Sequence, residues 1–208
     1  MKQNIKRIIL CVVITMTMQM VATAANVAAD ILNKAVSRYQ SVPSLTVDFN
    51  ITTPDAGSVA GTLVTAGDRF RLELPGMQTW YDGRTQWSYL QSVNEVNITE
   101  PTVEELAQIN PFAIVSAIKG TFTPTLVSSN QKRQVVRFTP TASGASDISS
   151  MTVTFDASTS WPQMIELVSS AGKVVITVTG VKTGGKLPAS AFVYNKKTHP
   201  GAEIVDLR

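Results

Sequence analysis

The segment TWYDGRTQWSYL, residues 79–90, predicts a β-hairpin and, with it, an antiparallel fold. Asp82 and Gly83 lie between two runs of aromatic and β-forming residues. Asp-Gly in such a place is typical of a two-residue turn, whose central residues need positive φ. If these two residues form the turn, Tyr81 pairs with Arg84 and the register of the whole hairpin follows.

The same register divides the side chains of the hairpin between two faces, because paired residues share a face and successive residues alternate. Trp80, Trp87 and Tyr89 project from one face, and the other face receives most of Met77, Tyr81 and Leu90. An aromatic face of this kind has to be covered by helices, by a second sheet, by a partner or by a ligand.

Residues 1–24 have the three parts of a secretory signal peptide, and we expect cleavage after Ala24. MKQNIKR is basic, the apolar run IILCVVITMTMQMV is short for a transmembrane span, and ATA supplies small residues before the cleavage point. An uncleaved membrane anchor is the less favoured alternative. The mature chain, residues 25–208, is then expected to be a single domain with a substantial core.

Loss of this leader removes the charge imbalance of the chain. Lys2, Lys6 and Arg7 are three of the 18 basic residues, so the mature chain carries 15 basic and 15 acidic residues. A nucleic-acid footprint needs a basic patch or stripe, and the sequence shows none. The single cysteine, Cys11, leaves with the leader, which excludes a disulfide framework and thiol chemistry from the mature chain.

Alternation of apolar and polar residues predicts strands along most of the mature chain. In LTVDFNIT, for example, Leu45, Val47 and Phe49 alternate with polar residues. Strands are expected at residues 45–52, 59–66, 68–74, 77–81, 84–98, 122–129, 133–140, 149–157, 163–170 and 173–182, with two further short ones at 187–195 and 203–208.

Two segments have helical periodicity instead. In residues 26–40 the apolar side chains recur at spacings of three and four, which predicts one amphipathic helix. In residues 99–120, Thr102 and Glu105 fit a capping box, and Pro111 is placed to end one short helix and to begin a second.

Together these elements predict an α+β fold that is mainly β, with about ten antiparallel strands, an N-terminal helix and a central helical insertion. Many strands joined by short turns indicate an incomplete, curved antiparallel barrel. A closed barrel like that of the lipocalins is the alternative, but helices with apolar stripes need a surface on which to dock. The concave face of an open sheet offers that surface, and the helices would form a lid over it.

Residues that could carry catalysis are few and scattered. His199 is the only histidine and lies in a loop, so a histidine-based nucleophile or a zinc site would depend on it alone. Glu104 and Glu105 lie in the first turn of a predicted helix, where carboxylates favour the helix dipole. Asp156 and Asp206 are isolated. We therefore expect no enzyme, no catalytic residue, no metal site and no cofactor.

The order of several motifs resembles one family. DGRT at residues 82–85 is followed by Trp87 and Tyr89, NPF stands at residues 110–112, and the chain ends with PGAEIVDLR. This arrangement resembles the periplasmic outer-membrane lipoprotein carriers of the Lol sorting pathway, the LolA family. The resemblance covers most of the mature chain, and the order of the motifs is more specific than any one of them.

The resemblance implies a fold and a function. The fold is a strongly curved, incomplete barrel whose open side is closed by a helical lid. The function is that of a monomeric chaperone in the periplasm that holds the acyl chains of lipoproteins in a hydrophobic cavity. It receives them from an inner-membrane lipoprotein-releasing transporter and delivers them to an outer-membrane acceptor, where one is present. Nucleic acid is not among the implied partners.

Residues that would line such a cavity are taken from the apolar faces of the strands and of the lid. The aromatic face of the hairpin is expected on the concave side. The expected ligand-binding residues are Leu45, Val47, Phe49, Phe70, Leu72, Trp80, Trp87, Tyr89, Leu106, Ile109, Phe112, Ile114 and Ile118. Each can equally be ordinary core, because core and cavity are the same surface in this architecture.

One position departs from the family pattern. The resemblance implies a strand arginine shortly before Phe70 that holds the lid, but residues 65–70 read TAGDRF. Arg69 alternates with Phe70 and is expected to point to solvent, as is Arg71. Three other functions stay open: a sensor of mislocalised lipoproteins with the same fold, a carrier of another lipid, and a secreted enzyme of unrecognised type.

Overall fold

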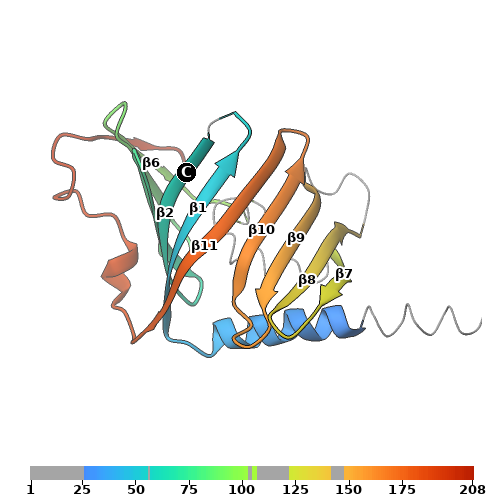
Figure 1. Ribbon diagram of the computed structural model, residues 1–208. Helices are drawn as coiled ribbons and strands as arrows, with labels where there is room; N and C mark the ends of the chain where they lie inside the picture. The colour runs from blue at the N-terminus through green and yellow to red at the C-terminus, as the bar shows by residue number, and fades with distance from the viewer. Residues whose placement is uncertain (1–25, 56, 103–104, 107–121, 142–147) are drawn as a thin grey trace, which may run out of the picture.

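The computed structural model describes residues 26–55, 57–102, 105–106, 122–141 and 148–208 (Figure 1). The strands of this part of the chain are β1 (Ser44–Thr53), β2 (Gly57–Ala66), β3 (Arg69–Leu74), β4 (Met77–Tyr81), β5 (Gln86–Leu90), β6 (Glu95–Thr99), β7 (Phe122–Ser129), β8 (Arg133–Pro140), β9 (Ile148–Asp156), β10 (Pro162–Ser169), β11 (Gly172–Gly184) and β12 (Glu203–Asp206). One short 3-10 helix, η1 (Ala189–Phe192), follows β11.

All of these strands belong to one sheet, in the order β12-β6-β5-β4-β3-β2-β1-β11-β10-β9-β8-β7. The predicted fold class, mainly β with an N-terminal helix, is confirmed. The expected number of about ten strands is wrong, because the described residues contain twelve. The predicted leader, residues 1–24, lies outside the described residues.

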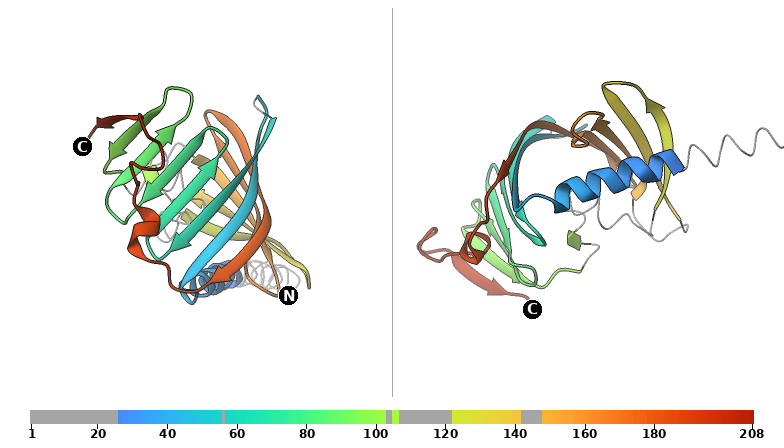
Figure 2. Two further views of the ribbon diagram at one scale, coloured as in Figure 1. Left: turned by 90° about the vertical axis from the view of Figure 1, so that its left-hand side faces the viewer. Right: turned by 90° about the horizontal axis from the view of Figure 1, so that it is seen from below.

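The sheet bends into an open arch, with β7 and β12 as its two edges (Figure 2). The helix at residues 26–40 lies under the arch, on its concave side, whereas the chain after β11 runs along the convex side at the β12 end. The predicted incomplete barrel is therefore present, and the described strands do not close into a lipocalin-like barrel.

The aromatic hairpin is present, but its loop is longer than predicted. β4 and β5 pair Trp80 with Trp87, so residues 82–85 form a four-residue loop and not a two-residue turn. Asp82 accounts for the difference, because its Oδ1 accepts hydrogen bonds from the backbone N–H groups two and three residues later, at 2.9 and 2.8 Å. The register differs from the prediction by two residues, and every side chain therefore keeps its predicted face.

The strand predicted at residues 84–98 is two strands. β5 ends at Leu90, and a turn precedes β6 in which Asn94 has φ 52°. Asparagine tolerates this left-handed conformation better than most side chains. The backbone N–H of Gln91 donates to the carbonyl of Gly76 at 2.9 Å, which closes the end of the β4–β5 pair. The turn reverses the chain, so β6 runs antiparallel to β5.

Two predictions for the C-terminal region are also wrong. Residues 187–195 do not form a strand, because Ala189–Phe192 form η1 and place Phe192 in a fully buried position. β12 is a strand as predicted, but it pairs in parallel with β6 and aligns Ile204 with Val96. Alternation indicates that a segment is extended, but it carries no information about the direction of its partner.

The predicted helix at residues 26–40 is confirmed. Its buried residues, Ala28, Ile31, Leu32 and Ala35, follow helical spacing and pack against the sheet. At its C-terminal end, the hydroxyl of Tyr39 donates a hydrogen bond to the carbonyl of Gly67 in the β2–β3 turn, at 3.2 Å. Burial raises the pKa of Tyr39, so the phenol stays a hydrogen-bond donor and fixes the helix end to the sheet.

Gly61 on β2 allows the ring of Phe49 to cross the backbone. A Cβ added at Gly61 would lie 2.7 Å from Cζ of Phe49 and 2.5 Å from Cδ2 of Leu74. Phe49 is 2% exposed, so its ring is enclosed by the core and does not lie at the surface. The absence of a side chain at Gly61 is therefore required by the close approach, and not by an unusual φ.

We expect Gly61→Ala to lower the free energy of unfolding by about 1–3 kcal/mol, because the added methyl group overpacks the core. Urea unfolding of the variant measures the loss. Phe49→Leu supplies the control, since a smaller side chain at residue 49 makes room for the methyl group. The double variant should lose less than the two single losses together. Strictly additive losses would contradict a clash between the added methyl group and the ring of Phe49.

Candidate functional site: the concave face of the sheet

The concave face carries one apolar wall that continues from β3 to β8. The register aligns Leu72 with Leu63 across β3 and β2, and Leu63 with Val47 across β2 and β1. The wall continues across β11, β10, β9 and β8, where every second residue of each strand points to the same face. The wall residues that are no more than 5% exposed are Leu45, Val47, Phe49, Leu63, Phe70, Leu72, Val136, Phe138, Met151, Val153, Phe155, Ile165 and Ile176.

Five of the predicted ligand-binding residues belong to this wall: Leu45, Val47, Phe49, Phe70 and Leu72. The structure places them in one cluster with the buried side of the helix at residues 26–40. Contact between these residues and a lipid stays a prediction, because the same side chains form the core of the protein.

The half of the wall on β8 to β11 was missed by the sequence reasoning. Phe138 and Val153 are fully buried there, and Ile165 is too. The signal was present, since these side chains alternate with polar ones in strands that were themselves predicted.

The predicted position of Trp80, Trp87 and Tyr89 on the concave face is wrong. Tyr81 packs on Phe70 with 5.3 Å between ring centroids and shares the face of the apolar wall, so Trp80 points to the opposite side of the sheet. Trp80 forms a second cluster with Val96 and Tyr194, and Trp87 and Tyr89 pack against it. The three aromatic side chains of the hairpin are therefore covered by the C-terminal segment on the convex face.

Stacked rings join this second cluster to the C-terminal segment. The ring of His199 stacks on Tyr89 with 3.7 Å between centroids, and Tyr194 meets Trp80 edge-on at 5.3 Å. Burial raises the pKa of Tyr194, and the neighbouring Tyr89 raises it further. His199 therefore packs among aromatic rings. It joins the C-terminal segment to the hairpin and is not an isolated loop side chain.

The prediction that Arg69 points to solvent is also wrong, although alternation assigned its face correctly. Its guanidinium carbon lies 5.3 Å from the ring centroid of Phe192, which is fully buried. Arg71, on the same face, has Nε 3.2 Å from Oε1 of Glu73, but the geometry is that of an ion pair without a hydrogen bond. Neither arginine lies on the concave face, so neither can hold a lid there.

Only the beginning of the predicted lid lies within the described residues. The capping box is confirmed: the backbone N–H of Thr102 donates to Glu105 Oε2 at 2.8 Å, and the N–H of Glu105 donates to Thr102 Oγ1 at 3.3 Å. Leu106 follows and packs against the apolar wall. The other predicted lid residues, Ile109, Phe112, Ile114 and Ile118, lie outside the described residues.

The wall changes from apolar to polar at the β4–β5 pair. Thr79 and Ser88 lie opposite each other, and their hydroxyl oxygens are 3.3 Å apart. Gln86 donates a hydrogen bond from Nε2 to the hydroxyl of Ser88 at 3.2 Å. Thr79 is 1% exposed and Gln86 is 8% exposed, so this polar corner is buried next to Tyr81.

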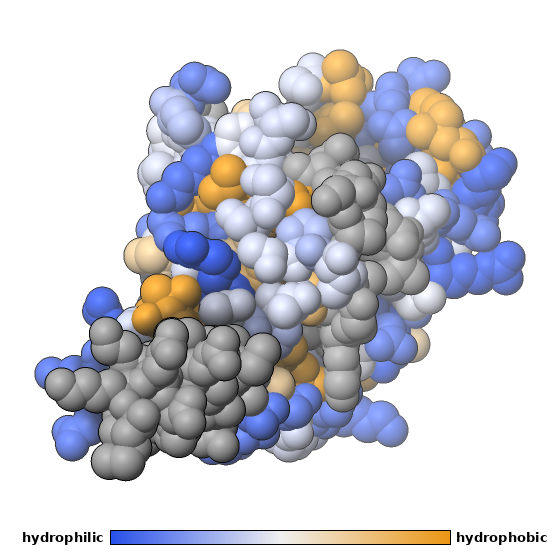
Figure 3. Space-filling view, turned by 90° about the vertical axis from the view of Figure 1, so that its right-hand side faces the viewer, coloured by the Kyte–Doolittle hydropathy of each residue, from blue (hydrophilic) through white to orange (hydrophobic). Residues whose placement is uncertain are grey.

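A groove of about 730 Å³, lined by polar and charged residues, lies between the helix at residues 26–40 and the β9–β10 loop. Its lining includes Lys34, Arg38 and Thr159, and the guanidinium carbon of Arg38 lies 5.5 Å from the ring centroid of Trp161. From the side of β7 and β8, the described surface is mainly hydrophilic or intermediate, with apolar side chains in separate patches (Figure 3). The large apolar surface of the sheet is turned inward.

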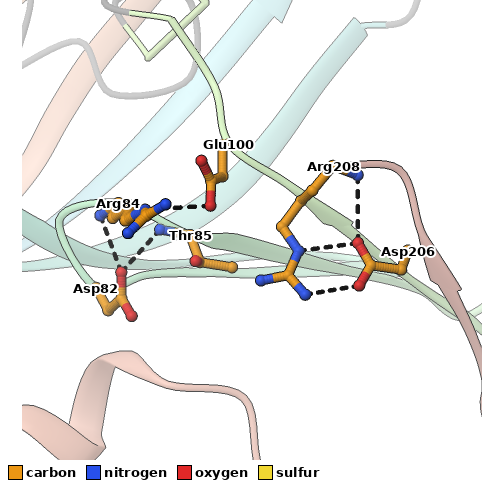
Figure 4. A network of polar contacts seen from close by, with 6 residues as sticks. All are labelled: Asp82, Arg84, Thr85, Glu100, Asp206 and Arg208. Carbon is orange, nitrogen blue, oxygen red and sulfur yellow. Dashed lines mark hydrogen bonds and ion pairs between the residues drawn. The ribbon is translucent and has the colours of Figure 1, made fainter.

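The isolated carboxylates have structural partners. Asp156 accepts four hydrogen bonds on Oδ1 from the β9–β10 loop, and these lower its pKa to about 2. Hydrogen bonds from Arg208, at 2.6 and 2.9 Å, likewise lower the pKa of Asp206 to about 2 (Figure 4). Arg84 of the hairpin loop bonds to Glu100 at 3.2 Å. These carboxylates therefore have structural partners in a loop or at the surface of the chain end.

Within the described ranges, no group of three or more metal-ligating side chains is close enough to hold a metal ion. The described helices include none that is both long and apolar enough to cross a membrane. What the described geometry offers is one large apolar face with a polar corner.

Solved structures similar to this chain share its fold. An uncharacterized conserved protein from Thermus thermophilus superposes with a TM-score of 0.60 at 13% identity, over 86% of this chain and 98% of that one. A putative outer membrane lipoprotein-sorting protein domain from Vibrio parahaemolyticus gives a TM-score of 0.51 at 11% identity, over 84% of this chain and 98% of that one. At these identities the likeness establishes the fold alone.

A family comparison by sequence goes further, although no curated protein matches the chain. The model of the family described as outer membrane lipoprotein carrier protein LolA matches residues 18–170. The match spans the N-terminal helix, the aromatic hairpin and most of the apolar wall. The chain therefore belongs to the LolA family of outer membrane lipoprotein carrier proteins.

Proposed function

We propose that this protein is a periplasmic carrier that binds the acyl chains of lipoproteins on the concave face of its sheet and moves them between membranes. The observation that carries the proposal is the continuous apolar wall from β3 to β8. Membership of the LolA family supports it. The predicted donor and acceptor, an inner-membrane transporter and an outer-membrane protein, are part of the proposal.

The energetics of such a carrier are favourable without covalent chemistry. Each buried methylene contributes about 0.8 kcal/mol, so an acyl chain of about fourteen methylenes gains roughly 11 kcal/mol when fully buried. Release requires that part of this gain be offset. The wall is covered by the helix at residues 26–40 and by Leu106. Cargo has to replace these contacts, and their loss lowers the net affinity.

The test is native mass spectrometry of the protein purified from cells that also produce an acylated lipoprotein. A one-to-one complex is expected with the acylated form and not with a lipoprotein whose acylated cysteine is replaced. Binding of small lipids without the lipoprotein would favour the alternative, a lipid carrier or a lipoprotein sensor of the same fold. Failure of both to bind would overturn the proposal.

A variant pair on β11 separates the two faces of the sheet. Val178 packs against the apolar wall, whereas Val175 is an odd number of residues away and points to the convex face. We expect Val178→Asn to weaken acyl binding about tenfold, because it places an amide against the acyl chain. Val175→Asn makes the same chemical change on the other face and should bind as the unchanged protein does. Equal losses in the two variants would contradict a concave site.

A further inference from the structure

The polar corner of the concave face contains a buried acceptor that has no partner among the described residues. Gln86 uses its Nε2 to donate to Ser88, whereas its Oε1 is buried and accepts no hydrogen bond from the described part of the chain. The residue is 8% exposed, so water reaches little of it. Buried polar atoms in folded proteins almost always have a partner, and an exception calls for a reason.

The register places this acceptor where the apolar wall ends. Gln86 lies opposite Tyr81, whose ring packs on Phe70 of the wall. On the other side it lies opposite Thr99, and the concave positions of β6 that follow are Asn97 and Glu95. Oε1 is therefore at the boundary between an apolar surface and a polar one. The head of an acyl chain that lies along the wall would have its polar linkage at such a boundary.

We propose that Gln86 Oε1 accepts a hydrogen bond from the N–H of an amide-linked acyl chain and makes the protein prefer amide-linked over ester-linked lipids. This inference rests on the proposed function. An amide N–H satisfies the acceptor, but an ester linkage has only acceptor atoms and leaves Oε1 unpaired. Sites built to hydrogen-bond a ligand discriminate strongly against analogues that lack the donor.

The polar corner is organised for this role. Nε2 of Gln86 is held by Ser88, and Ser88 is held by Thr79, which is 1% exposed. The bond from Nε2 fixes the amide plane of the side chain, so the direction of Oε1 is set before a ligand arrives. A preorganised acceptor loses little conformational freedom on binding.

The experiment compares two probes that differ only in whether the acyl chain is linked through an amide N–H or through an ester oxygen. N-palmitoylglycine methyl ester has an amide N–H, and the corresponding palmitoyl ester of methyl glycolate has an oxygen in its place. Their dissociation constants are measured by displacement of a fluorescent fatty acid. The unchanged protein should bind the amide about tenfold more tightly, the difference expected for one buried hydrogen bond. Equal affinities would overturn the inference without any variant.

Gln86→Met removes the acceptor and keeps the length of the side chain. This variant should bind both probes equally, with the affinity for the ester unchanged or higher. Gln78→Met is the matched control, since Gln78 pairs with Tyr89 on the convex face of β4. It should retain the tenfold preference. Retention of the preference in Gln86→Met would also overturn the inference.

The two failures are distinguishable. If the unchanged protein binds both probes equally and still captures an acylated lipoprotein, the carrier function stands and the role of Gln86 falls. If it binds neither probe nor the lipoprotein, both fall. A palmitoyl chain with a hydroxyl group in place of the amide gives a third arm: preference for it over the amide would assign the acceptor to a hydroxylated lipid and overturn the assignment to an amide.

Discussion

Removal of residues 188–208 is expected to lower the free energy of unfolding by at least roughly 6 kcal/mol. The deletion removes Phe192 and Tyr194, which are buried, and uncovers Trp80 and Val96. Burial of each such side chain contributes about 1.5–3 kcal/mol. A domain has about 5–15 kcal/mol in total, so the shortened protein should be largely unfolded or close to it.

Urea unfolding followed by tryptophan fluorescence measures this effect. Two of the three tryptophans, Trp80 and Trp87, lie against the deleted segment, so their emission should move to longer wavelength before any denaturant is added. Deletion of Arg208 alone is the control, since it breaks only a surface ion pair with Asp206. An unchanged unfolding midpoint in the long deletion would show that the C-terminal cover contributes nothing.

Phe138→Ala in β8 is expected to lower the free energy of unfolding by about 3–5 kcal/mol. Phe138 is fully buried in the apolar wall, and alanine leaves a cavity that the surrounding strands cannot fill completely. The midpoint of urea unfolding should fall, with little change in the slope of the transition.

Val168→Ala in β10 tests whether this loss belongs to the concave face. Val168 is 38% exposed, and its truncation should change the stability by less than about 0.5 kcal/mol. A loss in Phe138→Ala as small as that in Val168→Ala would mean that the wall at β8 is loosely packed. The wall would then be a cavity already open to cargo and not a closed core.

Sequence patterns identified most of the strands and the faces of the hairpin, because alternation depends only on local geometry. The hairpin shows that the faces can be predicted correctly even where the register is not. The loop at residues 82–85 was misjudged because Asp82 caps its own loop, and yet Trp80 and Tyr81 were assigned to the correct opposite faces. An error of two residues in register leaves the faces unchanged, whereas an error of one exchanges them.

Alternation could not decide which face is concave. Both faces of β4 are apolar: Trp80 is on one and Tyr81 on the other, and each is 7% exposed. The choice depends on Phe192 and Tyr194, more than 100 residues further along the chain. Local patterns contain no information about such contacts. For the same reason, the parallel pairing of β12 and the unpaired Oε1 of Gln86 could be found only in the structure.

The strand order also constrains the time course of folding. β1 pairs with β11 through Ser44 and Gly184, and β6 pairs with β12 through Val96 and Ile204, so both partners are more than 100 residues apart. Contacts this distant in sequence carry a large loop-closure entropy and form late. A chain made from its N-terminus therefore has two unpaired strand edges and an uncovered aromatic face until its final residues are available. During that interval the incomplete chain exposes apolar surface and is prone to aggregate. It therefore needs a chaperone of its own before it can bind a lipid.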